Sequence, residues 1–177
     1  ELGYARAMSS RWTSVAVLGL AAALLLAAAM SGRWLVADLQ SLEVNGSLRI
    51  GLTSLKACVA TAVGSQCERI EWAQLPGGTD GSMWMWLGRL TFAVCLAAAL
   101  GLLALGGLAA ADVEVRAPVP VPRLVLWLCL ALLPFMFGYY MFPPAGLRQL
   151  EAGAGFALAG AGAVLGGFGC WRLLPDD

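Results

Sequence analysis

The chain has 177 residues, of which 60% are hydrophobic and 12% charged, and its eleven basic and eleven acidic residues leave no net charge. A typical soluble domain carries about 25% charged residues, so this composition indicates a surface that faces lipid. The chain has no histidine, which removes the most versatile general base and the usual haem ligand. No excess of basic residues indicates nucleic-acid binding.

The first of four hydrophobic runs, at residues 12–31, is long enough to cross a hydrocarbon core of about 30 Å as a helix. It is too long for the core of a signal peptide, so we expect it to stay in the protein. Three further runs follow at 83–111, 124–142 and 153–174. Backbone groups in lipid must pair within their own segment, which predicts a helix for each run. The sequence therefore predicts a single tetraspan domain over 1–177, an all-α, left-handed four-helix transmembrane bundle.

The connection at residues 32–82 carries β-sheet signals. Asn45-Gly46 is typical of a hairpin turn, because both central positions of such a turn favour positive φ. We expect a second strand to continue from Leu52 to Val59, and a third at 68–72, where polar and apolar residues alternate. The prolines of the next connection, 112–123, predict a non-helical segment. Together these signals predict a small antiparallel sheet, outside the cytosol, built from the first loop.

Two of the five cysteines, Cys58 and Cys67, lie in this first loop. A close pair of cysteines outside the cytosol is typical of a disulfide, and the alternative is two free thiols in a reducing compartment. Cys95, Cys129 and Cys170 fall in predicted helices. We expect them to pack as small apolar side chains, so the sequence predicts no metal site and no cofactor.

Arginine is concentrated on one side of the predicted spans. Lys and Arg in short flanks mark the cytosolic side, and an even number of spans places both termini on the same side. The third loop carries one arginine, Arg148. The sequence therefore predicts a multi-pass protein of the plasma membrane or bacterial inner membrane with both termini in the cytosol. The arginines of the terminal side are Arg6, Arg11, Arg116, Arg123 and Arg172.

An ordered set of motifs accompanies these four spans. A tryptophan follows the first run, a Gly-Leu pair precedes two cysteines that eight residues separate, and an arginine lies near the start of the second run. In this respect the chain resembles the claudin and peripheral-myelin-protein superfamily of four-span proteins. The resemblance implies a disulfide-stapled sheet on a helix bundle, with structural roles for Trp34, Gly51, Leu52 and Arg89.

The resemblance extends to the second half of the chain. Phe142-Pro143-Pro144 is similar to the aromatic–proline turn of the family's second outer loop, and residues 150–154 lead into a fourth run rich in Gly and Ala. Thr53 stands where the family has a second tryptophan. The resemblance implies a protein that works by interaction rather than by catalysis.

Small residues recur at helical spacing along the fourth run. Such residues let helices approach closely in lipid. Two interpretations are open, namely packing within the bundle and docking of another subunit's helix. The residues concerned are Gly155, Ala159, Gly162, Ala163, Gly166 and Gly167.

Aromatic residues gather near the ends of the runs, as expected for belts at the two membrane interfaces. Arg89 is expected to extend outward or to contact loop carbonyls, because an ionised side chain at membrane depth is costly. A pair between Arg89 and Glu151 is a further possibility. The predicted belt residues are Trp12, Trp84, Trp86, Tyr139, Tyr140, Phe142 and Trp171.

The sequence contains no catalytic constellation, since it lacks histidine, a Cys-x-x-Cys pair and a phosphate-binding glycine loop. We therefore expect a non-enzymatic, claudin-like protein that acts in protein–protein interaction, assembly or cell adhesion through its outer loops. Its expected partners are membrane lipids and either a second copy or other membrane subunits, with no nucleic acid. The alternative is an accessory subunit of a larger complex, such as a channel or an energy-converting enzyme. The accessory role would use a helix face instead of the loops.

Overall fold

The structure is a computed structural model that describes residues 2–40, 45–61, 64–71, 79–111, 113, 121–143 and 150–174. The helices in this part of the chain are α1 (Leu2–Met30), α2 (Thr79–Ala111), α3 (Val121–Met141) and α4 (Ala154–Trp171). Each helix contains a stretch long and apolar enough to cross a membrane, and these stretches are Trp12–Met30, Met83–Ala111, Val121–Met141 and Ala154–Trp171. The four predicted runs are thereby confirmed as helices, and their length and apolar composition fit a multi-pass membrane protein.

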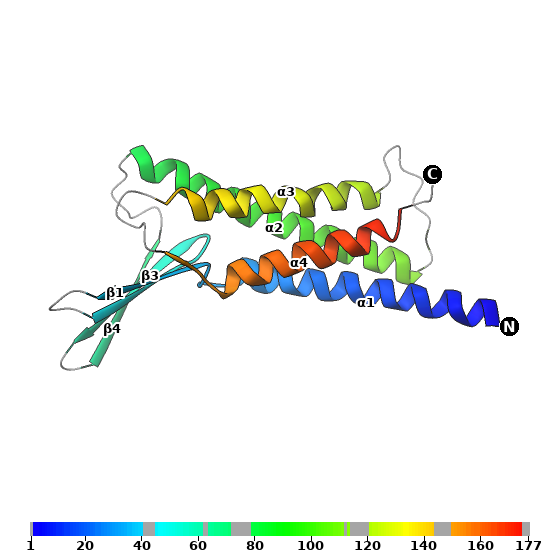
Figure 1. Cartoon of the computed structure of the whole chain (residues 1–177), viewed down its shortest axis with the longest axis horizontal. Coiled ribbons are helices and arrows are strands. Elements are labelled where there is room, and N and C mark those ends of the chain that lie inside the picture. The colour runs from blue at the N-terminus through cyan, green and yellow to red at the C-terminus, as the bar shows by residue number, and fades with distance from the viewer. Residues whose placement is uncertain are drawn as a thin grey trace.

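The four helices form one bundle, with a small sheet at one end (Figure 1). Helix α1 packs on α2 and α4, and α3 packs on α2 and α4. Successive helices run in opposite directions, so the start of α1 and the end of α4 lie together at the end away from the sheet (Figure 1). The interior is filled by Leu, Ala and small residues, among them Leu18, Leu25, Ala98, Leu102 and Leu132, all fully buried.

Three helices begin earlier than predicted, and among them α2 begins at Thr79 rather than at residue 83. Helix α1 begins at Leu2, ahead of the apolar stretch that begins at Trp12. Helix α3 begins at Val121, so Pro122 of the proline-rich connection is helical after all. A proline is tolerated in the first turn of a helix, because its missing N–H would have no partner there.

The sheet has five antiparallel strands in the order β4-β3-β2-β1-β5. Their bounds are β1 (Leu35–Gln40), β2 (Asn45–Ile50), β3 (Ser54–Thr61), β4 (Gly64–Glu71) and β5 (Glu151–Ala152). The first four strands come from the first loop, where three strands were expected, and β1 was not among them. The fifth was not predicted, and it comes from the segment before α4, where Glu151 pairs with Val36. The small antiparallel sheet is confirmed, but its source in the first loop alone is wrong.

The expected turn at Asn45-Gly46 is wrong, because both residues lie in strand β2. Asn45 pairs with Gln40, and Leu48 pairs with Ala37. A turn centred on Asn45-Gly46 would instead have placed Leu48 opposite Glu43. The register of a half-buried sheet follows its apolar face, and here that requirement overrides the local preference for an Asn-Gly turn.

A second correction concerns the strand expected from Leu52 to Val59. The chain reverses direction at residues 51–53, where the Gly51 N–H donates to the Ser54 carbonyl over 2.8 Å. Strand β3 then runs back beside β2, with Leu55 opposite Ile50. The third predicted strand, at 68–72, is confirmed as part of β4 up to Glu71.

Candidate functional site

The helices end at different levels, and this difference makes a seat for the sheet. The Cys95 thiol of α2 donates to the Leu25 carbonyl of α1 over 3.2 Å, so these two residues lie at one level. Helix α1 ends five residues beyond Leu25, at Met30, whereas α2 extends sixteen residues from Cys95 to its first residue, Thr79. The sheet occupies the step between the short and the long helices (Figure 1).

Trp34 is the central residue of this seat. Its side chain is fully buried, and its indole N–H donates to the Ala28 carbonyl at the end of α1 over 2.6 Å. Its backbone N–H donates to the Ile50 carbonyl of β2, and its carbonyl accepts the Gly153 N–H just before α4, both over 2.8 Å. One residue therefore joins the first helix, the sheet and the fourth helix.

Gly51 and Leu52 form the opposite side of the seat. Leu52 is buried, and the Gly51 carbonyl accepts the hydroxyl of Tyr139 from α3 over 3.0 Å. A Cβ atom added at Gly88 of α2 would lie 3.0 Å from the Leu52 carbonyl oxygen. The turn between β2 and β3 therefore rests directly on α2 and α3, and these two residues of the predicted family signature lie at the contact.

Trp84 and Tyr139 form a buried aromatic pair beneath this turn. Their rings are stacked, with centroids 4.8 Å apart and planes 10° from parallel, and the Trp84 indole N–H donates to the Tyr139 carbonyl over 2.7 Å. Both side chains are buried, so their assignment to an interfacial belt was wrong. Trp86 and Phe142 are exposed, as belt residues should be. The spacing of aromatics could not separate the two groups, because only packing decides which ring points inward.

Arg89 lies on the surface of α2. Its guanidinium carbon is 5.7 Å from the centroid of the Trp86 ring in the preceding turn, so cation–π attraction holds the charge at the helix surface. No ion pair joins Arg89 to Glu151, although the structure describes both side chains. Arg89 thus extends outward, and the sheet is held by Trp34, Gly51 and Leu52.

The small residues of α4 face the bundle interior. Gly155, Ala159, Gly162, Ala163 and Gly166 are buried, and Gly167 is half-buried. A Cβ atom at Gly162 would lie 2.8 Å from Leu25 Cγ of α1, and one at Gly166 would lie 2.8 Å from Leu102 Cδ1 of α2. Helices of the same chain therefore occupy this face, which leaves the five buried positions no room for another subunit's helix.

The predicted disulfide is present. Cys58 of β3 and Cys67 of β4 are joined, with 4.0 Å between their Cα atoms, and they are directly opposite each other in the strand pair. The other three cysteines are buried and free. Within the described ranges, no group of three or more His, Cys, Asp or Glu side chains is arranged to hold a metal ion.

A row of cations crosses the sheet next to the disulfide. Arg49 of β2 is opposite Lys56 of β3, which is opposite Arg69 of β4. Paired residues share one face of a sheet, and this face is the reverse of the one that buries Leu48, Ile50 and Leu55. Sequence analysis missed this row, because it becomes visible only when the register is known.

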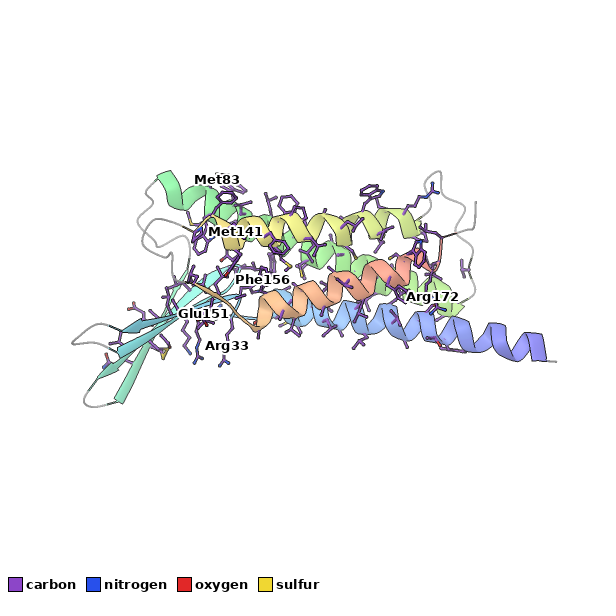
Figure 2. All side chains as sticks on the ribbon, viewed as in Figure 1. Arg33, Met83, Met141, Glu151, Phe156 and Arg172 are labelled. Atoms are coloured by element: carbon purple, nitrogen blue, oxygen red, sulfur yellow. A yellow bond between two sulfur atoms is a disulfide. The ribbon has the colours of Figure 1, made fainter. Side chains whose placement is uncertain are left out.

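The row opens on a cavity of about 450 Å³ at the junction of the sheet and α1. We call this cavity the basic groove. Figure 2 shows one of its residues, Arg33, at that junction, just beyond the end of α1. The groove is lined by Arg33, Arg49, Lys56 and Arg69, by the end of α1 from Ala29 to Gly32, by Gly51, Thr53 and Ser54, and by Phe92 of α2.

Comparison of the chain with protein-family models and with curated proteins found no match.

Proposed function

We propose that this chain is a claudin-like, non-enzymatic membrane protein that acts in protein–protein interaction or assembly through its sheet end. In this proposal the sheet lies outside the cytosol and both termini lie in the cytosol. The observation that carries it is an exposed edge strand on a firmly seated sheet. Strand β4 is at the edge of the sheet, and its Gln66, Glu68 and Arg69 side chains are exposed.

An exposed sheet edge offers unpaired backbone groups to a partner strand. Side chains near the edge then select the partner by charge. The seat formed by Trp34 and Tyr139 supports this role, because it holds the sheet in a fixed orientation relative to the helices. A partner that binds β4 would therefore be held in a defined geometry to the bundle.

The alternative is an accessory subunit that docks through a helix face. The small face of α4 is filled within the chain, and one remaining candidate is the outer face of α3. Trp127 and Phe137 there are 67% and 51% exposed, respectively. Contact with lipid alone also accounts for exposed apolar side chains on a membrane helix, which is why we place the sheet edge first.

The test compares a sheet-edge variant with a helix-face variant. Two differently labelled copies of the full chain are reconstituted in one set of vesicles, and their association is measured by energy transfer. In Gln66→Lys/Glu68→Lys the edge becomes strongly cationic, so we expect about a tenfold loss of association from like-charge repulsion. Trp127→Ala on α3, a more exposed position, serves as the control and should keep association unchanged.

The same pair of variants distinguishes the two proposed functions when the partner is a different protein and not a second copy of the chain. Proteins that co-purify with the chain in mild detergent are quantified for each variant. Loss of a co-purifying protein with Trp127→Ala, and its retention with the edge variant, would contradict the sheet-edge proposal and favour the accessory subunit.

A further inference from the structure

Of the row Arg49–Lys56–Arg69, the proposed interaction through the β4 edge uses Arg69 alone. Like charges directly opposite each other in adjacent strands destabilise a sheet. Here two such pairs share Lys56, and Arg33 adds a fourth cation to the same groove. A cluster of this kind is unfavourable when empty, so the arrangement itself points to an anion.

Among the carboxylate side chains that the structure describes, none forms an ion pair with these four cations. Glu151 lies in β5 opposite Val36, which separates it from Arg49 in the same row. Lys56, Arg33 and Arg69 are exposed, and Arg49 is partly buried. The four positive charges are therefore directed at a space that solvent or a ligand can enter.

The position of the groove relative to the membrane narrows the choice of anion. The apolar stretch of α1 has 19 residues and ends at Met30. At 1.5 Å per residue, this stretch matches the hydrocarbon thickness of about 30 Å. Arg33 lies three residues beyond Met30, so the groove lies at the level of the lipid head groups.

The lining of the groove is apolar on one side and cationic on the other. Met30, at the end of α1, is 85% exposed, and Phe92 of α2 contributes an aromatic ring from the bundle. The cations come from the sheet and from Arg33. A free anion would need the cationic side alone, whereas a phospholipid presents a phosphate next to the start of its acyl chains.

We propose that the basic groove binds one anionic phospholipid, with its phosphate among Arg33, Arg49, Lys56 and Arg69 and the start of its acyl chains against Met30 and Phe92. Arginine forks and a lysine ammonium are the usual partners of a phosphate. The bound head group neutralises the repulsion within the row. The lipid thereby becomes a component of the seat that fixes the sheet on the bundle.

The test uses the full chain, purified in mild non-ionic detergent and titrated with phosphatidylglycerol or phosphatidylcholine. Binding is counted by native mass spectrometry, and the thermal midpoint is measured in parallel. We expect one phosphatidylglycerol to bind and to raise the midpoint, while phosphatidylcholine has a much smaller effect. A cation near a lipid surface contributes about a fivefold change in affinity, so Lys56→Gln should weaken phosphatidylglycerol binding about fivefold.

Lys56→Gln also carries a second, independent expectation. Without lipid it should be at least as stable as the native chain, because it removes both like-charged pairs. A variant that lost lipid binding through misfolding would be less stable, so the two causes are separable. Arg172→Gln, which removes one positive charge at the other end of the bundle (Figure 2), is the control and should bind lipid as the native chain does.

Three results would overturn the proposal. The first is equal binding of phosphatidylglycerol and phosphatidylcholine, and the second is an equal loss of binding in Lys56→Gln and Arg172→Gln. The third is a full rise of the thermal midpoint with inorganic phosphate alone, which would mark the groove as a site for a soluble anion. Because Lys56 lies on the opposite face of the sheet from Gln66 and Glu68, failure here would leave the proposed interaction standing.

Discussion

Single residues that join distant segments decide how the sheet is held. Trp34, Trp84 and Tyr139 are buried aromatic residues, and each has its polar atom paired with a backbone carbonyl. An unpaired polar atom at such depth would be costly, so the hydrogen bonds fix ring orientation as well as position. These three residues bring together segments of α1, α2, α3 and the sheet.

Close packing against Trp34 predicts that alanine at one glycine of α4 lowers stability, whereas alanine at another does not. A Cβ atom at Gly155 would lie 2.6 Å from Trp34 Cδ1, whereas one at Gly160 would lie 3.7 Å from Met136 Cε. We expect Gly155→Ala to lower the free energy of unfolding by about 1–3 kcal/mol through overpacking. Gly160→Ala, the matched control, should cause no loss, because its new methyl group makes an ordinary contact.

The measurement is the thermal midpoint of each purified variant in detergent, together with the fluorescence of the buried tryptophans. Equal stability of the two variants would mean that Trp34 does not pack against α4 as described. A loss of stability in Gly160→Ala alone would mean that the tightly packed face of α4 is the one that carries Gly160 and not the one that carries Gly155.

At the scale of elements, the β3–β4 pair combines a repulsive and a stabilising contact. Lys56 opposes Arg69, and two residues along the same face Cys58 is bonded to Cys67. Strand β4 has no further neighbour within the described sheet. The disulfide therefore holds an edge strand that cross-strand repulsion would otherwise weaken.

Removal of this disulfide should loosen the sheet but not the helices. Closing a loop of about ten residues contributes roughly 2–3 kcal/mol in the chain-entropy model, so Cys58→Ser/Cys67→Ser should expose β3 and β4 to protease while the bundle stays assembled. Salt screens exposed charges, so the susceptibility should be greatest at low ionic strength. Limited proteolysis with mass identification of the cut sites gives the measurement.

A third substitution measures how much cross-strand repulsion contributes to the loosening of β4. Adding Lys56→Gln to the double serine variant should restore part of the protease resistance, because the cross-strand repulsion is gone. Cleavage that is unaffected by both salt and Lys56→Gln would show that repulsion in the row has no part in holding or loosening β4.

At the scale of the whole molecule, the structure places the sheet at one end of the bundle and the start of α1 and the end of α4 at the other (Figure 1). Glu151 and Arg172 are exposed at these opposite ends (Figure 2). Among the described residues, the three cysteines outside the disulfide are buried, so an introduced surface cysteine can be labelled selectively.

We expect a membrane-impermeant maleimide applied to intact cells to label Glu151→Cys and not Arg172→Cys. The arginine-rich flanks on the side of the termini motivate this orientation. Permeabilised cells serve as the control, in which both sites should react. Labelling of Arg172→Cys alone in intact cells would reverse the orientation and place the sheet in the cytosol.

The sequence by itself determined the features that depend on composition and on short spacing. Apolar runs of about 20 residues can satisfy their backbone groups in lipid only as helices, so the four apolar stretches were predicted to within about three residues. Cys58 and Cys67 lie close enough along the chain to pair across one hairpin, so the disulfide could be predicted. These features need no knowledge of what the segments later contact.

Only the tertiary structure decided the sheet register and the residues that depend on it. Apolar residues had to face the helices, so Leu48 took Ala37 as its partner and Asn45-Gly46 became part of a strand. The same register brought Arg49, Lys56 and Arg69 into one row, although they are distant in sequence. Trp84 and Tyr139 are likewise buried because the helices end at different levels and the sheet sits in the step between them. Such arrangements arise from packing between segments, and no local pattern in the chain encodes them.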